Sequence, residues 1–326
     1  MPRIKAWRLR IDPPPCSVSN ARLMSALHLA LSLPRIRQNA EQIVARTKVE
    51  FWPTIKANAY GLGAQQVADS LADIAAGFCF FSFDEAAELN LHNKPSIILG
   101  PPAANLSVQD YVARRARPAV STLVQARALR AAHPILCVDT GMQRFACPPA
   151  EIESVLKAGE IHEAFTHATR VEHAEQLAGL LAYHQPIKLH AAASSLLDQP
   201  AAYLDAVRPG LALYRGAVRI SARLVEVHSS KGPIGYSGWT SPTGYHGIIL
   251  AGYADGLRTG PCIINQRKQR ITEVGMQTAY VTLSPADAMG DEVVLLGDTL
   301  TESDLAFAWN ATPHQAILQL AKACSR

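Results

Sequence analysis

The sequence lacks the cysteine patterns that build disulfide frameworks or zinc sites. Its six cysteines form no Cys-x-x-Cys pair and have no framework spacing; they are Cys16, Cys79, Cys137, Cys147, Cys262 and Cys324. Scattered thiols of this kind are typical of a protein in a reducing compartment. We therefore expect free cysteines, no metal site and a cytoplasmic location.

Long hydrophobic runs and concentrated charge are also missing. No stretch approaches the roughly 18 apolar residues of a membrane span, and the net charge of +4 is spread along the chain. The tight basic cluster at residues 267–270 is too short to indicate nucleic-acid binding. Residues 23–33 have the length of a signal-peptide core, but they contain a histidine and lack an Ala-x-Ala cleavage site. We expect them to form a helix or an insertion, and we expect neither membrane nor nucleic acid as a partner.

Short apolar runs alternate with helical patterns between about residues 50 and 216. The candidate strands are residues 51–55, 77–82, 96–99, 118–121, 135–138, 164–167, 187–190 and 207–213. Eight strands with helical crossovers over this length predict a (β/α)8 TIM barrel. No Gly-x-Gly-x-x-Gly follows the first strand, which argues against a doubly wound dinucleotide-binding sheet.

The pattern changes after Gly216. Short segments rich in β-branched residues and separated by turn residues predict strands at 219–228, 247–250, 271–276, 279–283 and 292–296. A longer helical pattern appears only at residues 315–323. The predicted fold is a barrel at residues 34–216, followed by a smaller, mostly β domain at 217–326. Residues 1–33 are expected to form an N-terminal extension or strand partly associated with the β domain.

Polar residues follow several candidate barrel strands, at the end where barrel active sites form. They are Lys56 after the first strand, Arg144 after the fifth, His167 at the end of the sixth, His190 and Ser194 at and after the seventh, and Arg208 in the eighth. Each alone has a structural explanation, such as a buried histidine or a surface arginine. Their joint placement on one rim favours a functional site.

The chemistry of this rim points to a cofactor. No Ser-His-Asp spacing, pair of catalytic carboxylates or metal-binding cluster is evident. A reactive lysine with glycine and serine groups able to hold a phosphate fits pyridoxal phosphate, which forms a Schiff base with lysine. We therefore expect pyridoxal 5'-phosphate at Lys56.

Sequence blocks in consistent order resemble the alanine racemase family. The block Ile55-Lys-Ala-Asn-Ala-Tyr-Gly is similar to the pyridoxal-phosphate signature of that family. Further similar blocks lie at residues 138–144, 166–169, 190–192, 208–214, 235–236 and 252–256, and residues 7–12 weakly resemble the opening strand. The resemblance implies an amino acid racemase, acting on alanine, that supplies D-alanine for peptidoglycan. It also implies a homodimer with active sites at the subunit interface.

The resemblance also implies residue roles. Lys56 would hold the cofactor and act as one base, and Tyr236 of the partner subunit would be the second. Arg208 would face the pyridine nitrogen; because a guanidinium only donates hydrogen bonds, that nitrogen would stay unprotonated. The other implied cofactor contacts are Tyr60, His167, His190, Ser194, Gly210, Leu211 and His314, and the implied substrate contacts are Arg144, Tyr253 and Met276.

Four positions depart from the family pattern. Cys137 stands where some members carry a modified lysine, Ala193 replaces an asparagine, Gln277 an aspartate and His314 a tyrosine. Two alternatives therefore stay open beside the alanine racemase: a racemase of broader specificity, and a pyridoxal-phosphate-binding protein with little or no catalysis. Decarboxylation of a basic amino acid is a weaker third alternative. Retention of Lys56 and Tyr236 favours the alanine racemase.

Overall fold

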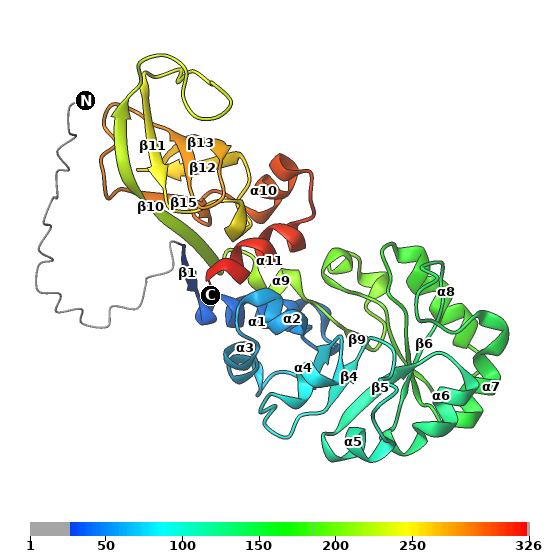
Figure 1. Ribbon diagram of the computed structural model, residues 1–326. Coiled ribbons are helices and arrows are strands. Elements are labelled where there is room, and N and C mark those ends of the chain that lie inside the picture. The colour runs from blue at the N-terminus through cyan, green and yellow to red at the C-terminus, as the bar shows by residue number, and fades with distance from the viewer. Residues whose placement is uncertain (1–26, 185, 325–326) are drawn as a thin grey trace, which may run out of the picture.

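The structure, a computed structural model, describes residues 27–184 and 186–324. Figure 1 shows two parts, one built on an eight-stranded parallel sheet and the other on a seven-stranded antiparallel sheet. The stretch at residues 7–12 that resembles an opening strand lies outside the described residues. Within the described ranges, no helix is both long and apolar enough to cross a membrane.

The parallel sheet is a closed barrel. Its strands lie in the order β2-β9-β8-β7-β6-β5-β4-β3. They are β2 (Glu50–Phe51), β3 (Phe78–Phe80), β4 (Ser96–Ile98), β5 (Ala116–Val120), β6 (Ile135–Cys137), β7 (Glu163–Phe165), β8 (Lys188–His190) and β9 (Ala206–Val207). The chain after β2 also pairs with β3, since Cys79 donates its N–H to Pro53 O at 2.9 Å and Ile55 donates to Cys79 O at 3.0 Å. The predicted (β/α)8 fold is confirmed.

Helices connect the strands and cover the outer face of the barrel (Figure 1). They are α1 (Leu33–Thr47), α2 (Lys56–Gly61), α3 (Ala64–Leu71), α4 (Phe83–Ala87), α5 (Val108–Ala113), α6 (Leu123–Ala128), α7 (Ile152–Gly159), α8 (Val171–Leu181) and α9 (Leu211–Tyr214). Short 3₁₀ turns lie at Arg130–Ala132, Pro149–Glu151, Ser194–Leu196, Pro200–Ala202 and Tyr253–Asp255. Each crossover returns the chain to the same end of the barrel, so the residues that follow the strands gather on one rim.

The barrel interior is a separate core. Side chains alternate along each strand between the interior and the helix-covered face. The interior cluster consists of Trp52, Cys79, Ile97, Ala119, Ile135, Cys137, Phe165 and Ala206. Lys56 lies four residues after Trp52, His167 two after Phe165 and Arg208 two after Ala206, so this alternation directs all three towards the interior at the carboxyl-terminal rim.

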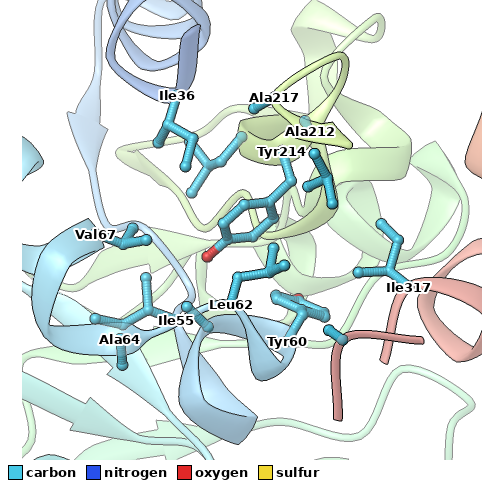
Figure 2. Packing of buried hydrophobic residues seen from close by; sticks show 14 of the residues in the cluster. Ile36, Ile55, Tyr60, Leu62, Ala64, Val67, Ala212, Tyr214, Ala217 and Ile317 are labelled. Atoms are coloured by element: carbon cyan, nitrogen blue, oxygen red, sulfur yellow. The ribbon is translucent and has the colours of Figure 1, made fainter. Parts of the chain in front are cut away.

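The larger core packs the helices against the barrel. Figure 2 shows Tyr214 surrounded by Ile36, Leu62 and Val67, which come from three different segments. The Tyr60 ring meets the Tyr214 ring edge-on at a centroid distance of 5.3 Å. This packing fixes the segment that follows Lys56 against α1 and α9.

The second part is mostly β, as predicted. Its strands are β1 (His28–Leu31), β10 (Val218–Ser229), β11 (Tyr245–Ile249), β12 (Gly260–Ile264), β13 (Arg267–Val274), β14 (Ala279–Thr282) and β15 (Glu292–Leu296). Their order is β1-β10-β11-β14-β13-β12-β15, and β15 also pairs with β10, so six strands close on themselves. The chain ends in α10 (Glu302–Trp309) and α11 (Pro313–Cys324), and α11 packs against α2 of the barrel (Figure 1).

Two predicted elements are wrong. Residues 207–213 were expected to be a strand, but β9 ends at Val207 and residues 211–214 form α9. Pro209 has no N–H for a strand ladder, and Ser194 Oγ accepts the N–H groups of Gly210 and Ala212, which favours a helical turn. Residues 23–33 were expected to be a helix or an insertion, yet 28–31 form β1, with Leu31 opposite Val218 of β10. Leucines at alternate positions from Leu27 fit a strand.

Strand β12 and helix α10 were among the elements missed. Strand β12 contains Gly260 and Pro261, which read as turn residues in the sequence. Helix α10 follows Thr301, whose hydroxyl accepts the Asp304 N–H at 3.2 Å while the Asp304 carboxylate accepts the Thr301 N–H at 2.8 Å. This capping box was a sequence signal that could have located the helix.

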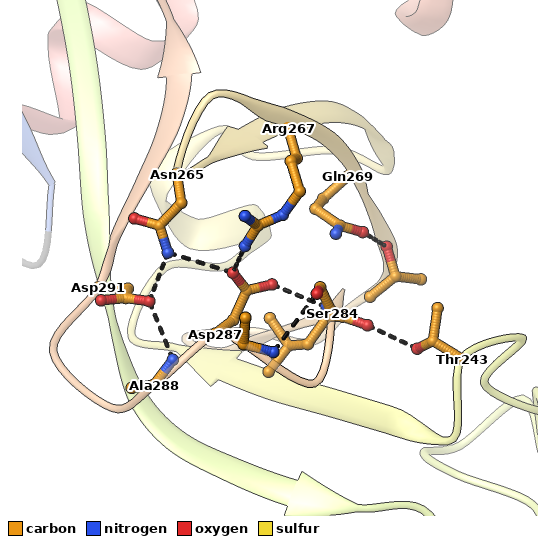
Figure 3. Close-up of polar contacts among 11 residues, drawn as sticks. Thr243, Asn265, Arg267, Gln269, Ser284, Asp287, Ala288 and Asp291 are labelled. Atoms are coloured by element: carbon orange, nitrogen blue, oxygen red, sulfur yellow. Dashed lines mark hydrogen bonds and ion pairs between the residues drawn. The ribbon is translucent and has the colours of Figure 1, made fainter.

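A polar cluster fixes the turn between β12 and β13. Figure 3 shows Asn265 and Arg267 of this turn pointing at Asp287 and Asp291. Asn265 Nδ2 donates to Asp291 Oδ2 at 2.7 Å, and Arg267 forms an ion pair with the buried Asp287. Asp287 also accepts the Ser284 N–H at 2.7 Å. The buried carboxylate is therefore compensated, and β12 and β13 are tied to the loop before β15.

Candidate active site

A cavity of about 460 Å³ opens at the carboxyl-terminal rim of the barrel. This size is typical of a small-molecule site. Its lining includes the sequence-predicted residues Lys56, Tyr60, Arg144, His167, Ser194, Arg208, Gly210 and His314, together with Cys137 and Ala193. The structure thus brings together these residues from five barrel strands or the loops that follow them, and from α11.

Lys56 opens a strained turn at the base of this cavity. The next four residues, Ala57 to Tyr60, have φ between 53° and 60°, a left-handed conformation that is costly for residues with a side chain. Beside backbone hydrogen bonds, two side chains hold the turn: Glu85 Oε1 accepts the Ala57 N–H at 3.2 Å, and Asn58 Oδ1 accepts the Ala64 N–H at 2.8 Å. Burial, and then the charge of Arg144, hold the pKa of Lys56 below its usual value. Such an amine is more easily deprotonated and can attack an aldehyde.

Arg208 lies in the wall of the cavity with an unused donor. Its side chain is buried, with 3% of the residue exposed. One terminal nitrogen donates to Thr166 O at 2.7 Å, and the guanidinium carbon lies 4.6 Å from the centre of the Phe165 ring. The buried Nε has no hydrogen-bond partner among the described residues. Because an unpaired buried donor is unfavourable, this position fits an acceptor atom of a bound molecule.

Ser194, Gly210 and Tyr60 form a small cradle in the lining of the cavity. Ser194 Oγ accepts the N–H groups of Gly210 at 2.9 Å and Ala212 at 3.0 Å, which leaves its own proton free to donate. A side chain at Gly210 would overlap the Tyr60 hydroxyl, so only glycine allows this approach. Burial raises the pKa of Tyr60 to about 12, and its hydroxyl therefore keeps its proton. The cradle offers neutral donors of the kind that bind phosphate oxygens.

Two histidines complete the cavity. Burial, and then the charge of Arg208, lower the pKa of His167 to about 4, so its ring is neutral at pH 7. The His314 ring lies 5.6 Å from the Tyr60 ring, and burial followed by the charge of Lys56 lowers its pKa as well. Two of the predicted contacts do not line the cavity: His190 and Leu211. Leu211 begins α9 directly behind Gly210.

Beneath the cavity lies a buried carboxylate that sequence reasoning missed. Glu163 of β7 pairs with Arg117 at 2.6 Å, and its Oε1 lies 2.9 Å from Nε2 of the fully buried His190. The imidazole and carboxylate are close but not aligned as a hydrogen bond. Burial acts to raise the pKa of Glu163, but His190 and Arg117 outweigh it, and the pKa falls to about 2. Glu163 is therefore an ionised carboxylate paired with Arg117.

Three predicted residues lie away from the cavity in this chain. Tyr236, Tyr253 and Met276 belong to the β domain and are 93%, 58% and 60% exposed. Neither they nor Gln277 line the cavity. Exposed aromatic and methionine side chains of this kind are typical of surfaces that bind another protein.

Comparison with known proteins gives one family for both parts. Residues 31–218 match the family model of the alanine racemase N-terminal domain, and residues 217–326 match that of the alanine racemase C-terminal domain. An alanine racemase of Pectobacterium atrosepticum is 30% identical, covering 89% of this chain and 92% of the relative. One from Helicobacter pylori strain J99 is 29% identical, covering 83% and 90%.

Solved structures share the fold. The biosynthetic alanine racemase from Pseudomonas aeruginosa matches with a TM-score of 0.81 at 23% identity, covering 91% of this chain and 97% of that chain. An alanine racemase from Bartonella henselae with covalently bound pyridoxal phosphate matches with a TM-score of 0.80 at 21% identity, covering 91% and 98%. The family models and the relative of 30% identity confirm the family resemblance seen in the sequence.

Proposed function

The chain belongs to the alanine racemase family, and on that premise we propose that it is a pyridoxal-phosphate-dependent enzyme that interconverts L-alanine and D-alanine with two bases. The observation that carries this proposal is a single cavity that holds Lys56, the unpaired buried Nε of Arg208 and a cradle of neutral donors. These three features match the aldehyde, the ring nitrogen and the phosphate of one molecule.

The residues present fit this cofactor. Lys56 would bind it covalently, and Arg208 would donate to its ring nitrogen. Tyr60, Ser194, Gly210, Leu211 and His314 would bind the phosphate. His167 would pack against the ring, and His190 would hold Arg208 in place. Bound there, pyridoxal phosphate withdraws electrons from the substrate α-carbon and makes its hydrogen acidic. Because Arg208 can only donate, it keeps the ring nitrogen unprotonated and moderates this withdrawal, which favours prompt return of the proton.

Racemisation needs a proton removed on one face of the α-carbon and returned on the other. Lys56 Nζ would exchange the proton on one face, since its pKa is lowered by burial and by Arg144. Tyr236 Oη would exchange it on the opposite face. Arg144 lines the cavity and would bind the substrate carboxylate.

Tyr236 can take this role only from another subunit. It is almost fully exposed and lies outside the cavity of its own chain. We therefore propose a homodimer in which the surface formed by Tyr236, Tyr253 and Met276 closes the cavity of the partner. The arrangement would exclude water from the proton-transfer step and narrow the substrate entrance.

Further parts of the proposal concern the cell and the chain. We propose a cytoplasmic enzyme that supplies D-alanine for peptidoglycan. We also propose the domain division 34–216 for the barrel and 217–326 for the β domain, with the N-terminal extension contributing to the β domain. Pairing of β1 with β10 supports this last point.

Reconstituted protein gives a direct test. Incubated with pyridoxal phosphate, it should turn yellow, and it should convert L-alanine to D-alanine as followed by chiral chromatography. Lys56→Ala should stay colourless after removal of free cofactor and should have no measurable turnover. Colourless wild-type protein would contradict the whole proposal.

The same assay separates the alternatives. A yellow protein that neither racemises alanine nor exchanges its α-hydrogen in ²H₂O would be a cofactor-binding protein with little catalysis, as the changes at Cys137, Ala193, Gln277 and His314 would allow. Comparable turnover of serine or other amino acids would indicate a broader racemase.

A further inference from the structure

Tyr236 lies at the tip of a tight turn, and its side chain does not pack against the rest of the chain to hold that turn in place. The turn spans residues 235–238 and is closed by Ile234, which donates its N–H to Trp239 O at 2.8 Å. The Tyr236 side chain is 93% exposed, so packing does not fix it within the chain. What directs this tyrosine must therefore act through the backbone of the turn.

The carboxylate of Glu273, at the end of β13, holds that backbone. Tyr236 donates its N–H to Glu273 Oε1 at 2.7 Å, and Ser237 donates its N–H to Oε2 at 2.8 Å. The Ser237 hydroxyl donates to the same oxygen. Gly235, with φ of +68°, passes so close to the carboxylate that a side chain there would overlap it. Glu273 itself is buried, so the turn rests on a fixed anion.

The residues directly after Glu273 orient the other exposed side chains of this surface. Gly275 O accepts the Tyr253 N–H at 2.9 Å, and Met276 O accepts the Ala254 N–H at 3.0 Å. Met276 itself lies in this segment. One stretch of backbone, residues 273–276, therefore sets the relative positions of Tyr236, Tyr253 and Met276.

We propose that Glu273 is a positioning residue for the second base, and that its carboxylate fixes how far the Tyr236 hydroxyl reaches into the partner's cavity. The inference rests on the proposed two-base function. Proton transfer depends steeply on distance, and a misplacement of about 1 Å can cost on the order of 100-fold in rate. Glu273 touches neither substrate nor cofactor, and it acts only through the turn.

The test compares racemisation with α-hydrogen exchange of each enantiomer in ²H₂O, using Glu273→Ala and Glu273→Gln. Tyr236→Phe serves as the reference, because loss of the second base should stop racemisation while Lys56 still exchanges the hydrogen of one enantiomer. Glu226→Gln is the matched control, a glutamate of β10 in the same sheet that pairs with His228. The absorbance of bound pyridoxal phosphate is read for every variant.

Glu273→Ala should reproduce the Tyr236→Phe pattern: cofactor absorbance retained, racemisation reduced about 10- to 100-fold, and exchange retained for the enantiomer that Lys56 serves. Glu273→Gln keeps one acceptor oxygen and should show an intermediate loss, and Glu226→Gln should match the wild type. The inference would be wrong if Glu273→Ala racemised alanine at the wild-type rate. It would also be wrong if this variant lost its bound cofactor and exchanged the α-hydrogen of both enantiomers equally slowly. Wild-type protein that does not racemise would instead overturn the proposed function, and the inference with it.

Discussion

At the scale of single residues, Glu163 is a buried charge whose effect on stability should depend on pH. Its folded pKa of about 2 lies below the ordinary value of 4.5. The ionised carboxylate therefore contributes stability above pH 4.5, and this contribution is lost as the pH falls from 4.5 towards 2. Its size is on the order of 3 kcal/mol.

We predict that Glu163→Gln destabilises the protein most at pH 7, because Arg117 then loses its charged partner. The difference in unfolding free energy from the wild type should shrink as the pH falls below 4.5. Urea unfolding at pH 7, 5, 4 and 3 measures this. Glu153→Gln removes an exposed pair with Lys157 and should change little at any pH. If the difference in unfolding free energy between Glu163→Gln and the wild type stays constant with pH, Glu163 is not ionised in the folded protein.

His314 stands where the family pattern has a tyrosine, and we expect its side chain to affect cofactor binding. A neutral imidazole offers one N–H donor, and a hydrogen bond to a charged group contributes roughly 1.5–3 kcal/mol. We predict that His314→Ala weakens pyridoxal phosphate binding at least about 10-fold, whereas His314→Tyr retains wild-type affinity because a phenol can also donate. Absorbance titration of cofactor-free protein gives both values, and unchanged affinity in His314→Ala would remove this residue from the phosphate site.

At the scale of elements, α1 and α9 are joined by one buried side chain. Asn39 Nδ2 donates to Leu213 O and Arg215 O, both at 2.9 Å. We predict that Asn39→Ala lowers the free energy of unfolding by about 2 kcal/mol, because two carbonyl groups lose their donor. It should also weaken cofactor binding, since α9 follows Gly210 of the phosphate cradle.

Urea unfolding and cofactor titration measure these two effects. Gln38→Ala is the matched control on the same helix, where the side chain is exposed and accepts a hydrogen bond from Arg35. Equal effects in the two variants would contradict a specific role for the Asn39 contacts.

The helices and strands also show how much of the structure could be predicted from the sequence. All eight barrel strands could be located, because short apolar runs between helical patterns leave few other folds. The eighth was overextended: Pro209 was visible within the run, but the Ser194 contacts that favour the helical turn come from the loop after β8 and leave no local pattern. Lys56, Arg208 and Ser194 were found through rim position and family blocks. Glu163 and Glu273 were missed because their partners, His190 and Tyr236, lie 27 and 37 residues away and leave no local pattern.

At the scale of the whole molecule, the proposed dimer predicts complementation between inactive subunits. Lys56→Ala and Tyr236→Phe should each be nearly inactive alone. A mixed dimer would contain one site with both bases intact, and statistical mixing would restore about a quarter of wild-type activity. Subunit exchange followed by the racemisation assay measures this. If Tyr236 served its own chain, mixing would restore nothing.

The pairing of β1 with β10 makes the barrel an insertion within the β domain. The chain leaves the antiparallel sheet after Leu31, passes through the whole barrel and returns opposite the same strand at Val218. Ser32 donates its N–H to Ala217 O at 2.8 Å, so the two junctions lie side by side. A barrel from a relative could therefore be exchanged as a cassette between these junctions, leaving the surface that carries Tyr236 unaltered.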